Sequence, residues 1–263
     1  MKGHFLTALN ALAVFAVLVG VWQAFAWISG TPAYVLPTPL EVAKAIAERH
    51  ATLVDSLLIS TTSAAGGLAL SIVAGVGVAM IFAQWPWLRR MLYPYTILLQ
   101  TVPIIAITPL IILWMGSGTW PVTVVTFIIC LAPIIANTTQ GLISVDENLI
   151  DLFLMHKASR AQILFKLRLP HAMPYMFAGI RISAGIAVIG AITGEWFAGS
   201  SRVGQGGLGY SIMYASSQLQ TAYLFALVIA ATVLGFSFFF MVMSVEWYVL
   251  HNWHESKRNA RAE

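Results

Sequence analysis

The chain has 263 residues and a mean hydropathy of +0.83, with 59% hydrophobic and only 9% charged residues. Because soluble domains carry about 25% charged residues, this composition excludes a soluble enzyme, a disordered chain and a free nucleic-acid binder. Four stretches contain no Asp, Glu, Lys or Arg, and each is longer than the roughly 20 apolar residues that cross a bilayer. The sequence therefore predicts a membrane protein. The four stretches lie at 3–40, 56–88, 91–145 and 203–245.

The apolar stretches do not alternate between apolar and polar residues, so we expect helices and not the strands of a membrane barrel. An all-α fold with six transmembrane helices in a single domain, 1–263, is predicted. The stretch 91–145 holds two helices because Gly116, Gly118 and Pro121 mark a turn in its middle. The first apolar run is too long for a cleavable signal peptide and is interpreted as a retained helix. The six helices are placed at 5–28, 57–83, 91–115, 120–143, 172–195 and 221–248.

The basic residues predict the orientation, because Lys and Arg near the ends of spans resist translocation. Ten fall on one side and three on the other, which places both termini and a basic tail, 249–263, in the cytoplasm. The net charge of +4 then reflects topology, and no nucleic-acid partner is expected. The ten are Lys2, Arg89, Arg90, Lys157, Arg160, Lys166, Arg168, Lys257, Arg258 and Arg261, and the three are Lys44, Arg49 and Arg202.

The outer connection at 30–56 carries a signal for the start of a helix. Thr38 is expected to cap the helix, Pro39 to occupy its first position and Glu41 to complete a capping box. The residues that follow separate into an apolar face and a charged face. A short helix on the outer surface is therefore predicted.

Small residues and prolines in the spans indicate how the helices pack and bend. Small residues recur every four positions in the second span, which lets another helix approach closely. Prolines interrupt the third and fourth spans, and we expect kinks or local unwinding there that suit gate elements. The small residues are Gly67, Ser71, Gly75 and Ala79, and the prolines are Pro103, Pro109 and Pro133.

Polar side chains within the spans are candidates for a solute path, because burial against lipid would leave their hydrogen-bonding groups unmet. The candidates are Gln100 and Thr101 in the third span, Asn137 in the fourth and Glu195 at the outer end of the fifth. A single Thr more often bonds a carbonyl of its own helix. Arg181, in the fifth span, is either a snorkelling or capping arginine or a partner of the cytoplasmic segment described next.

The longest cytoplasmic connection, 144–170, contains two capping signals in succession. They predict two short helices, the second of which Pro170 is expected to end. The apolar residues of the connection exceed what a solvated loop needs. Two interpretations remain open at this point: an amphipathic pair that rests on anionic lipid, or a docking element for a cytoplasmic partner. The capping signals pair Ser144 with Glu147 and Ser159 with Gln162.

The same connection carries a spaced set of residues: Asp151-Leu152-Phe153, Lys157-Ala158-Ser159, Leu167 and Leu169-Pro170, followed by Pro174 and Ala178-Gly179-Ile180-Arg181. This set resembles the EAA motif of binding-protein-dependent ABC importer permeases. Further segments resemble the nitrate/sulfonate/taurine branch of that family, and the resemblance covers roughly residues 34–250. These segments are Leu36-Pro37-Thr38-Pro39, Gln100-Thr101-Val102-Pro103, Gly194-Glu195-Trp196 and Gly207-Leu208-Gly209-Tyr210.

The resemblance implies a type I importer permease that has no catalytic residues and forms the translocation path for a small solute. It implies four partners: an ABC ATPase dimer that uses ATP and Mg, a second permease copy, a periplasmic or lipid-anchored solute-binding protein, and the lipid of the bacterial inner membrane. The chain has no G-x-x-x-x-G-K-[ST] phosphate loop, so a separate energy source and no cofactor on this chain are expected. The implied ATPase-coupling residues are Asp151, Leu152, Phe153, Lys157, Ala158, Ser159, Arg160 and Pro170.

The chain departs from the family pattern at two points. Asp151-Leu152-Phe153 replaces Glu-Ala-Ala, and Lys157 replaces a glycine that serves the turn between the two short helices. A side chain at a positive φ costs on the order of 1 kcal/mol. We therefore expect the bend to differ locally, in preference to a contact between Lys157 and the ATPase.

Two other function classes compete with an importer subunit. A self-sufficient channel or secondary carrier would show an ionisable relay or paired inverted halves, and an intramembrane enzyme would show a polar cluster within the bilayer. The glycines of a G-x-G-x-x-G pattern, Gly204, Gly206 and Gly209, follow a span and no strand, so they indicate a loop near the external gate and no dinucleotide site. The lone Cys130 favours neither a disulfide nor a metal site.

The solute stays open among those of the family branch, which include nitrate, sulfonates, taurine, bicarbonate, pyrimidine vitamin precursors and flavins. The candidate path contains two amides and one acid, Glu195, and no Lys. This composition argues against a high-affinity anion site in the membrane part. We expect selectivity to reside mainly in the external binding protein.

Overall fold

The computed structural model describes residues 2–199 and 206–251, without the side chains of 2–9, 11, 12 and 15. These residues form α-helices and one π-helical turn, and the described part contains no strand, which confirms the all-α class. Gly204 and residues 252–263 of the predicted basic tail lie outside the described residues. The elements are α1 Lys2–Ile28, α2 Pro39–Glu48, α3 His50–Gln84, α4 Pro86–Thr101, α5 Ile104–Met115, α6 Thr119–Ile143, α7 Glu147–Met155, α8 Arg160–Ile163, η1 Leu164–Arg168, α9 Leu169–Ala198, α10 Leu208–Ser217 and α11 Thr221–Leu250.

Four helices are long and apolar enough to cross a membrane: α3, α6, the helix Arg160–Ala198 that contains α9, and α11. The predicted third span is two helices, α4 and α5, which meet at a bend of 97°. Counted as one span, this pair raises the number among the described residues to five, and Ala16–Ile28 in α1 is a shorter apolar helix. The count of six spans stays a prediction.

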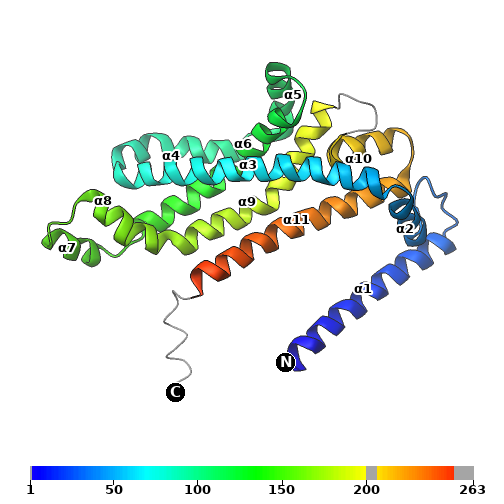
Figure 1. Cartoon of the computed structure of the whole chain (residues 1–263), viewed down its shortest axis with the longest axis horizontal. Helices are drawn as coiled ribbons and strands as arrows, with labels where there is room; N and C mark the ends of the chain where they lie inside the picture. Colours follow the sequence, from blue (N-terminus) through cyan, green and yellow to red (C-terminus); the bar gives the residue numbers. More distant parts are fainter. Residues whose placement is uncertain (1, 200–205, 252–263) are drawn as a thin grey trace.

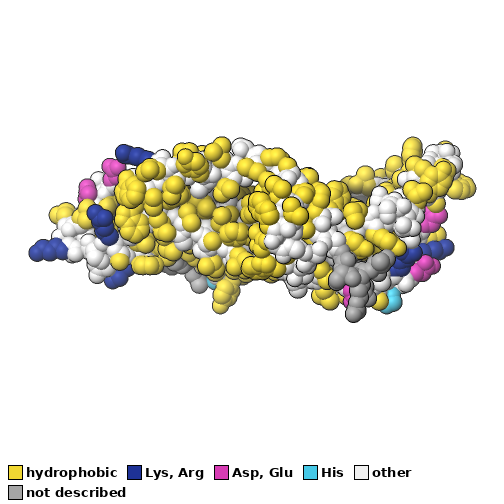
Figure 2. Space-filling view, turned by 90° about the horizontal axis from the view of Figure 1, so that it is seen from above, with side chains coloured by type: hydrophobic (Ala, Val, Ile, Leu, Met, Phe, Trp, Pro, Cys, Tyr) yellow, Lys and Arg dark blue, Asp and Glu magenta, His cyan; other side chains and the backbone are white. Residues whose placement is uncertain are grey.

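Helices α3, α6, α9 and α11 run side by side, and most of α1 lies apart from them (Figure 1). The segment with α7 and α8 forms one end, and α2 and α10 lie at the other, while α5 projects from the body. Lys and Arg side chains gather at the α7 and α8 end, and further charged side chains lie at the opposite end (Figure 2). The surface between the two ends is mostly hydrophobic, as expected for a protein that crosses a membrane.

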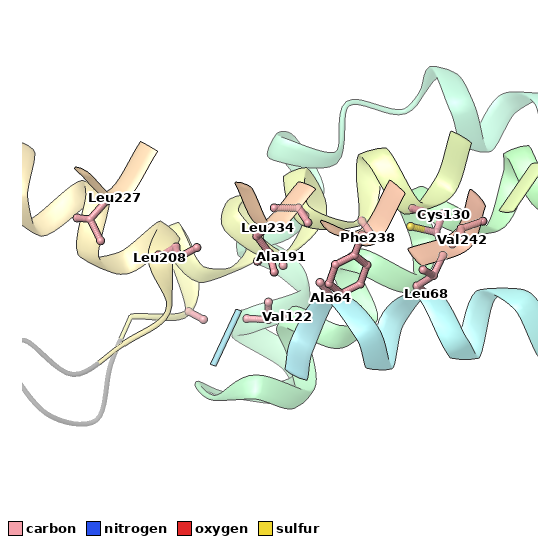
Figure 3. Close-up of a cluster of buried hydrophobic side chains, with 14 of the residues drawn as sticks. Ala64, Leu68, Val122, Cys130, Ala191, Leu208, Leu227, Leu234, Phe238 and Val242 are labelled. Carbon is pink, nitrogen blue, oxygen red and sulfur yellow. The ribbon is translucent and has the colours of Figure 1, made fainter. Parts of the chain in front are cut away.

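The hydrophobic core lies where α3, α6, α9 and α11 meet (Figure 3). The most extensive contacts join α6 to α9 and α3 to α6, so α6 is the centre of the bundle. Phe238 supplies a large buried side chain from α11, and Ala64 and Ala191 supply small surfaces from α3 and α9. Close packing of α3, α6 and α9 therefore depends on small residues.

The stripe of small residues in α3 packs against α6, as predicted. A Cβ on Gly67 would lie 2.5 Å from the Cβ of Thr126, and a Cβ on Gly75 would lie 2.8 Å from Cγ2 of Ile134. Ser71 joins the two helices directly, because its Oγ donates to the carbonyl of Phe127 at 2.8 Å. Both glycines are therefore required for the close approach of the two backbones.

The predicted outer helix, α2, is confirmed with its capping box. The backbone N–H of Thr38 donates to Oε2 of Glu41 at 2.8 Å, and the N–H of Glu41 donates to Oγ1 of Thr38 at 3.3 Å. Pro39 occupies the first turn, and Val42 turns inward and is buried in the core. This contact fixes α2 against the bundle.

The prolines of the third and fourth spans affect their helices differently. Val102 and Pro103 are both extended, with ψ of 120° and 105°, and they separate α4 from α5. Pro103 therefore breaks the span, because proline disfavours the helical conformation of the residue before it. Pro109 and Pro133 lie inside α5 and α6, which continue past them. The helices are not unwound at these two positions, and a kink there stays a prediction.

Replacement of Gly67 by Ala should destabilise the bundle by about 1–3 kcal/mol, because the added methyl group overlaps Thr126. Gly77→Ala is the matched control in the same helix, since nothing lies within 4 Å of a Cβ at Gly77. It should be neutral or stabilising. Thermal unfolding of both variants in detergent measures the difference. Equal unfolding temperatures would contradict the assigned packing of α3 on α6.

Candidate functional site

The connection 144–170, which is predicted to be cytoplasmic, begins with a cap different from the one expected. Oδ1 of Asp146 accepts the N–H of Asn148 at 2.8 Å and caps α7. Ser144 instead ends α6, and its Oγ bonds the carbonyl of Gly141 at 3.2 Å. The predicted capping box of Ser144 and Glu147 is therefore wrong, because α6 extends to Ile143 and uses Ser144 at its own end.

The turn after α7 has the geometry that a glycine would adopt. Lys157 has a φ of +56°, its N–H donates to the carbonyl of Leu154 at 2.9 Å, and the N–H of Ala158 donates to Phe153 at 3.0 Å. These two bonds form a Schellman motif, which usually carries glycine at the positive φ. The expectation of a different bend is wrong. The bend is kept, and Lys157 adopts the strained backbone at a cost of about 1 kcal/mol.

The second short helix continues into the membrane without a break. Ser159 and Gln162 form the predicted capping box at the start of α8. Pro170 does not end this helix, because η1 widens the preceding turn and the N–H of Leu169 reaches back to the carbonyl of Leu164. A π-turn of this kind accommodates a residue that cannot donate. The result is a continuous helix of 39 residues, Arg160–Ala198.

Two hydrogen bonds tie this helix to the cytoplasmic end of α3. Nη1 of Arg168 donates to the carbonyl of Ala83 at 2.8 Å, which is one of the last carbonyls of α3. Nε2 of Gln84 donates to the carbonyl of Arg160 at 3.3 Å. A guanidinium at a helix C-terminus stabilises both the free carbonyls and the helix dipole. The base of the cytoplasmic segment is thus fixed to the bundle.

The tip of the segment exposes apolar side chains. Met155 is 81% exposed, and no residue of α7 is buried. Lys157 and Arg160 are exposed beside this surface. Exposed apolar side chains next to basic ones are typical of a site that binds another molecule. The other large exposed apolar side chains are Leu149, Leu152, Leu154 and Phe165.

At the opposite end of the same helix, Glu195 is buried between α9, α3 and α10. Its Oε2 accepts the hydroxyl of Ser60 and the N–H of Gly209, each at 2.8 Å. The Oγ of Ser60 in turn accepts the N–H of Leu208 at 2.8 Å. A Cβ on Gly207 would overlap the Glu195 carboxyl group, so a larger residue there would displace this side chain. Glu195 also borders a cavity of about 200 Å³.

The other candidate path residues lie apart from Glu195. Gln100 is exposed and borders a second cavity, of about 270 Å³, at the break between α4 and α5. Thr101 donates its hydroxyl to the carbonyl of Leu98, a bond within its own helix. Nδ2 of Asn137 donates to the carbonyl of Pro133 at 2.9 Å, and its Cβ lies against Gly179. Gln100 and Glu195 thus line two separate cavities.

The match to known proteins agrees with this arrangement. Residues 67–246 match the family described as the binding-protein-dependent transport system inner membrane component. The chain belongs to this family. It is a multi-pass permease subunit of an ABC importer.

The names of this permease's relatives refer to different solutes. The formylaminopyrimidine transport permease protein ThiX of Halalkalibacterium halodurans is 31% identical and covers 91% of this chain and 94% of its own. The riboflavin transport system permease protein RibX of Chloroflexus aurantiacus is 34% identical over 76% of this chain and 75% of its own. The putative aliphatic sulfonates transport permease protein SsuC of Bacillus subtilis is 31% identical over 86% and 81%.

Arg181 of the permease has a partner that neither sequence interpretation named. Its guanidinium forms an ion pair with Glu246 of α11, and both side chains are partly buried. This pair joins α9 to α11, and it does not reach the cytoplasmic segment. Each charge would be costly to bury alone, so the pair neutralises both within the bundle.

Sequence reasoning missed two sets of residues in the permease. Ser60 and Ser63 lie with Ser56 and Ser71 on the buried face of α3, at spacings of three, four and eight residues. The helical spacing of these serines could have indicated that they share one face of the helix. Arg168 carried no local signal for its bond to Ala83, since the two residues meet only in the folded chain.

Lys157→Gly should raise the free energy of unfolding of the permease by up to about 1 kcal/mol, because glycine adopts a positive φ without strain. Leu219→Gly is the matched control, since Leu219 has a φ of +55° at the opposite end of the molecule. Thermal unfolding should show a similar effect for both. If Lys157→Gly alone weakens ATPase binding, the Lys157 side chain is itself a contact.

Proposed function

We propose that α7 and α8 dock an ABC ATPase dimer, which hydrolyses ATP with Mg²⁺ and drives the permease. The observation that carries this proposal is the continuous helix Arg160–Ala198, whose 39 residues span roughly 58 Å at 1.5 Å each. A bilayer with its headgroups is only about 40–45 Å thick. The tip therefore stands clear of the lipid, which favours a protein partner over an amphipathic pair lying on the membrane.

The proposed orientation puts α7, α8 and both termini in the cytoplasm of a bacterial cell, with the chain in the inner membrane. It is supported by the Lys and Arg side chains at the end that carries α7 and α8 (Figure 2). The name of the matched family also refers to an inner membrane component. The segment 144–170, together with the coupling residues of the EAA-like motif, is then the coupling segment.

We further propose a homodimer with the solute path between its two copies. α5 projects from the body (Figure 1), and its Leu113 and Trp114 are 77% and 75% exposed. Gln100 is exposed beside the base of α5, and its amide would lose several hydrogen bonds if it faced lipid. A second copy against α4 and α5 would cover the apolar surface and leave Gln100 beside an aqueous path.

The solute is proposed to be small and to arrive from a periplasmic or lipid-anchored binding protein. The names of the relatives, which include a pyrimidine, a flavin and sulfonates, support this range of solutes. Nitrate and taurine belong to the same proposed range. The binding protein would meet the end of the permease that carries α2 and α10.

Arg160→Glu should release the ATPase subunit and abolish transport-coupled ATP hydrolysis, because it reverses a charge at the edge of the proposed docking surface. A Glu at the first position of α8 suits the helix dipole, so the helix itself should persist. Ala158→Trp, which enlarges the turn, should have the same effect. Co-purification with the ATPase and the ATP hydrolysis rate provide the measurements.

Lys44→Glu is the matched charge reversal, because Lys44 is exposed on α2 at the opposite end. It should leave ATPase binding unchanged. Normal assembly and coupling in both cytoplasmic variants would favour the lipid-resting alternative and a self-sufficient carrier.

Cysteine at Gln100, in a Cys130→Ala background, should react with a small membrane-impermeant thiol reagent in at least one nucleotide state. The reaction rate should change when ATP is trapped, since alternating access exposes a path to one side at a time. Val73→Cys is the control, because Val73 is 76% exposed on the membrane-facing surface of α3. A rate for Gln100→Cys as low as that of the control in every state would exclude Gln100 from the path.

A further inference from the structure

Two buried residues at the outer end of the permease line the same cavity, and each has one side-chain oxygen without a hydrogen-bond partner. Glu195 is 3% exposed, and its Oε1 is unpartnered although Oε2 accepts two hydrogen bonds. Ser63 is 1% exposed, and its Oγ is also unpartnered. Buried polar atoms are almost always paired in proteins, so this pair of oxygens points to a missing group.

The cavity is small and has no basic side chain among its described lining residues. Its volume is about 200 Å³, which exceeds the space of roughly 10–15 Å³ that one water needs but falls below the range of about 300 Å³ and more for drug-sized ligands. Ile59, Val122 and Ala198 supply apolar walls, and Glu195 and Ser63 supply the buried polar ones. A single ring or a short amine fits such a space.

The chemistry of the two oxygens selects the kind of group. An ionised carboxylate only accepts hydrogen bonds, and a serine hydroxyl both accepts and donates. As a carboxylate, Glu195 would accept an N–H donor at Oε1, above all a protonated or polarised one, and would repel an anion at this low dielectric. Gly207 lies directly on the carboxyl group of Glu195. A ligand therefore reaches Oε1 only when the backbone at Gly207 moves away.

We propose that Glu195 and Ser63 form a subsite at the outer end of the path for the nitrogen-bearing, hydrogen-bond-donating part of the solute. The transported solute is then an amine or an amino-substituted heteroaromatic ring, and not an anion without donors such as nitrate or a simple alkanesulfonate. This inference rests on the proposed function as a solute-conducting permease. It assigns Ser63 a role in solute selection that its position on α3 alone does not suggest.

The test uses the permease–ATPase complex in nanodiscs, with Ile59→Cys in a Cys130→Ala background as a reporter in the cavity wall. Methyl methanethiosulfonate modifies the cysteine, in the nucleotide-free and vanadate-trapped states, with or without a probe. The probes are 4-aminopyrimidine, which carries N–H donors, and methanesulfonate, which has none. We expect 4-aminopyrimidine to slow modification in at least one state and methanesulfonate to leave the rate unchanged.

Two added substitutions and one control reporter make the test specific. Glu195→Gln, which places an amide donor where Oε1 accepts, should weaken protection by 4-aminopyrimidine by about tenfold or more, as expected for a lost charged hydrogen bond. Ser63→Ala should weaken it while keeping the bonds of Glu195 to Ser60 and Gly209. Ile107→Cys, beside the cavity at the α4 and α5 break, should show no protection.

Several outcomes would overturn the proposal. Equal protection by methanesulfonate, or protection that survives both Glu195→Gln and Ser63→Ala, would refute the donor-binding subsite. An Ile59→Cys reporter that is unreactive in every state, or that no probe protects, would show that the cavity does not bind solute. If the ATPase still co-purifies in these cases, the proposed function stands without the subsite, whereas loss of the ATPase from the unmodified permease would count against the proposed function itself.

Discussion

The rest of the structure depends on the continuity of one helix, Arg160–Ala198. It carries the proposed docking segment at one end and Glu195 at the other, and it is hydrogen-bonded to α3 at both ends. Arg168 makes one of these contacts through Ala83, and Glu195 makes the other through Ser60. Because α3 also packs closely on α6, we expect these three helices to move together if the proposed docking segment moves.

The π-turn explains how this continuity is compatible with the sequence. A proline at position 170 removes one backbone donor and crowds the preceding turn, which normally ends or kinks a helix. Widening η1 relieves the crowding, with Leu169 bonded to Leu164 across the turn. The backbone strain at Lys157 lies outside this helix, in the turn before α8. The helix is therefore continuous from Arg160, and the chain changes direction at the Schellman turn before it.

The sequence correctly predicted those features that depend only on residues close together in the chain. The capping boxes of Thr38 and Ser159 formed as expected, because each needs only side chains three residues apart. Prediction failed where elements compete or meet at a distance. Ser144 ends α6 and does not begin α7, and Pro170 does not end its helix, because η1 widens the preceding turn. The burial of Glu195 depends on α3 and α10, which approach it only in the folded chain.

The distribution of charge inside the bundle sets the character of the proposed path. Along α6, α9 and α11 the acidic and basic side chains are Arg181, Glu195 and Glu246. Arg181 and Glu246 neutralise each other at the contact of α9 with α11. Glu195 has no basic partner among the described residues, only hydroxyl and amide donors on one oxygen. As a carboxylate, Glu195 would favour cations and N–H donors over anions at this point of the proposed path.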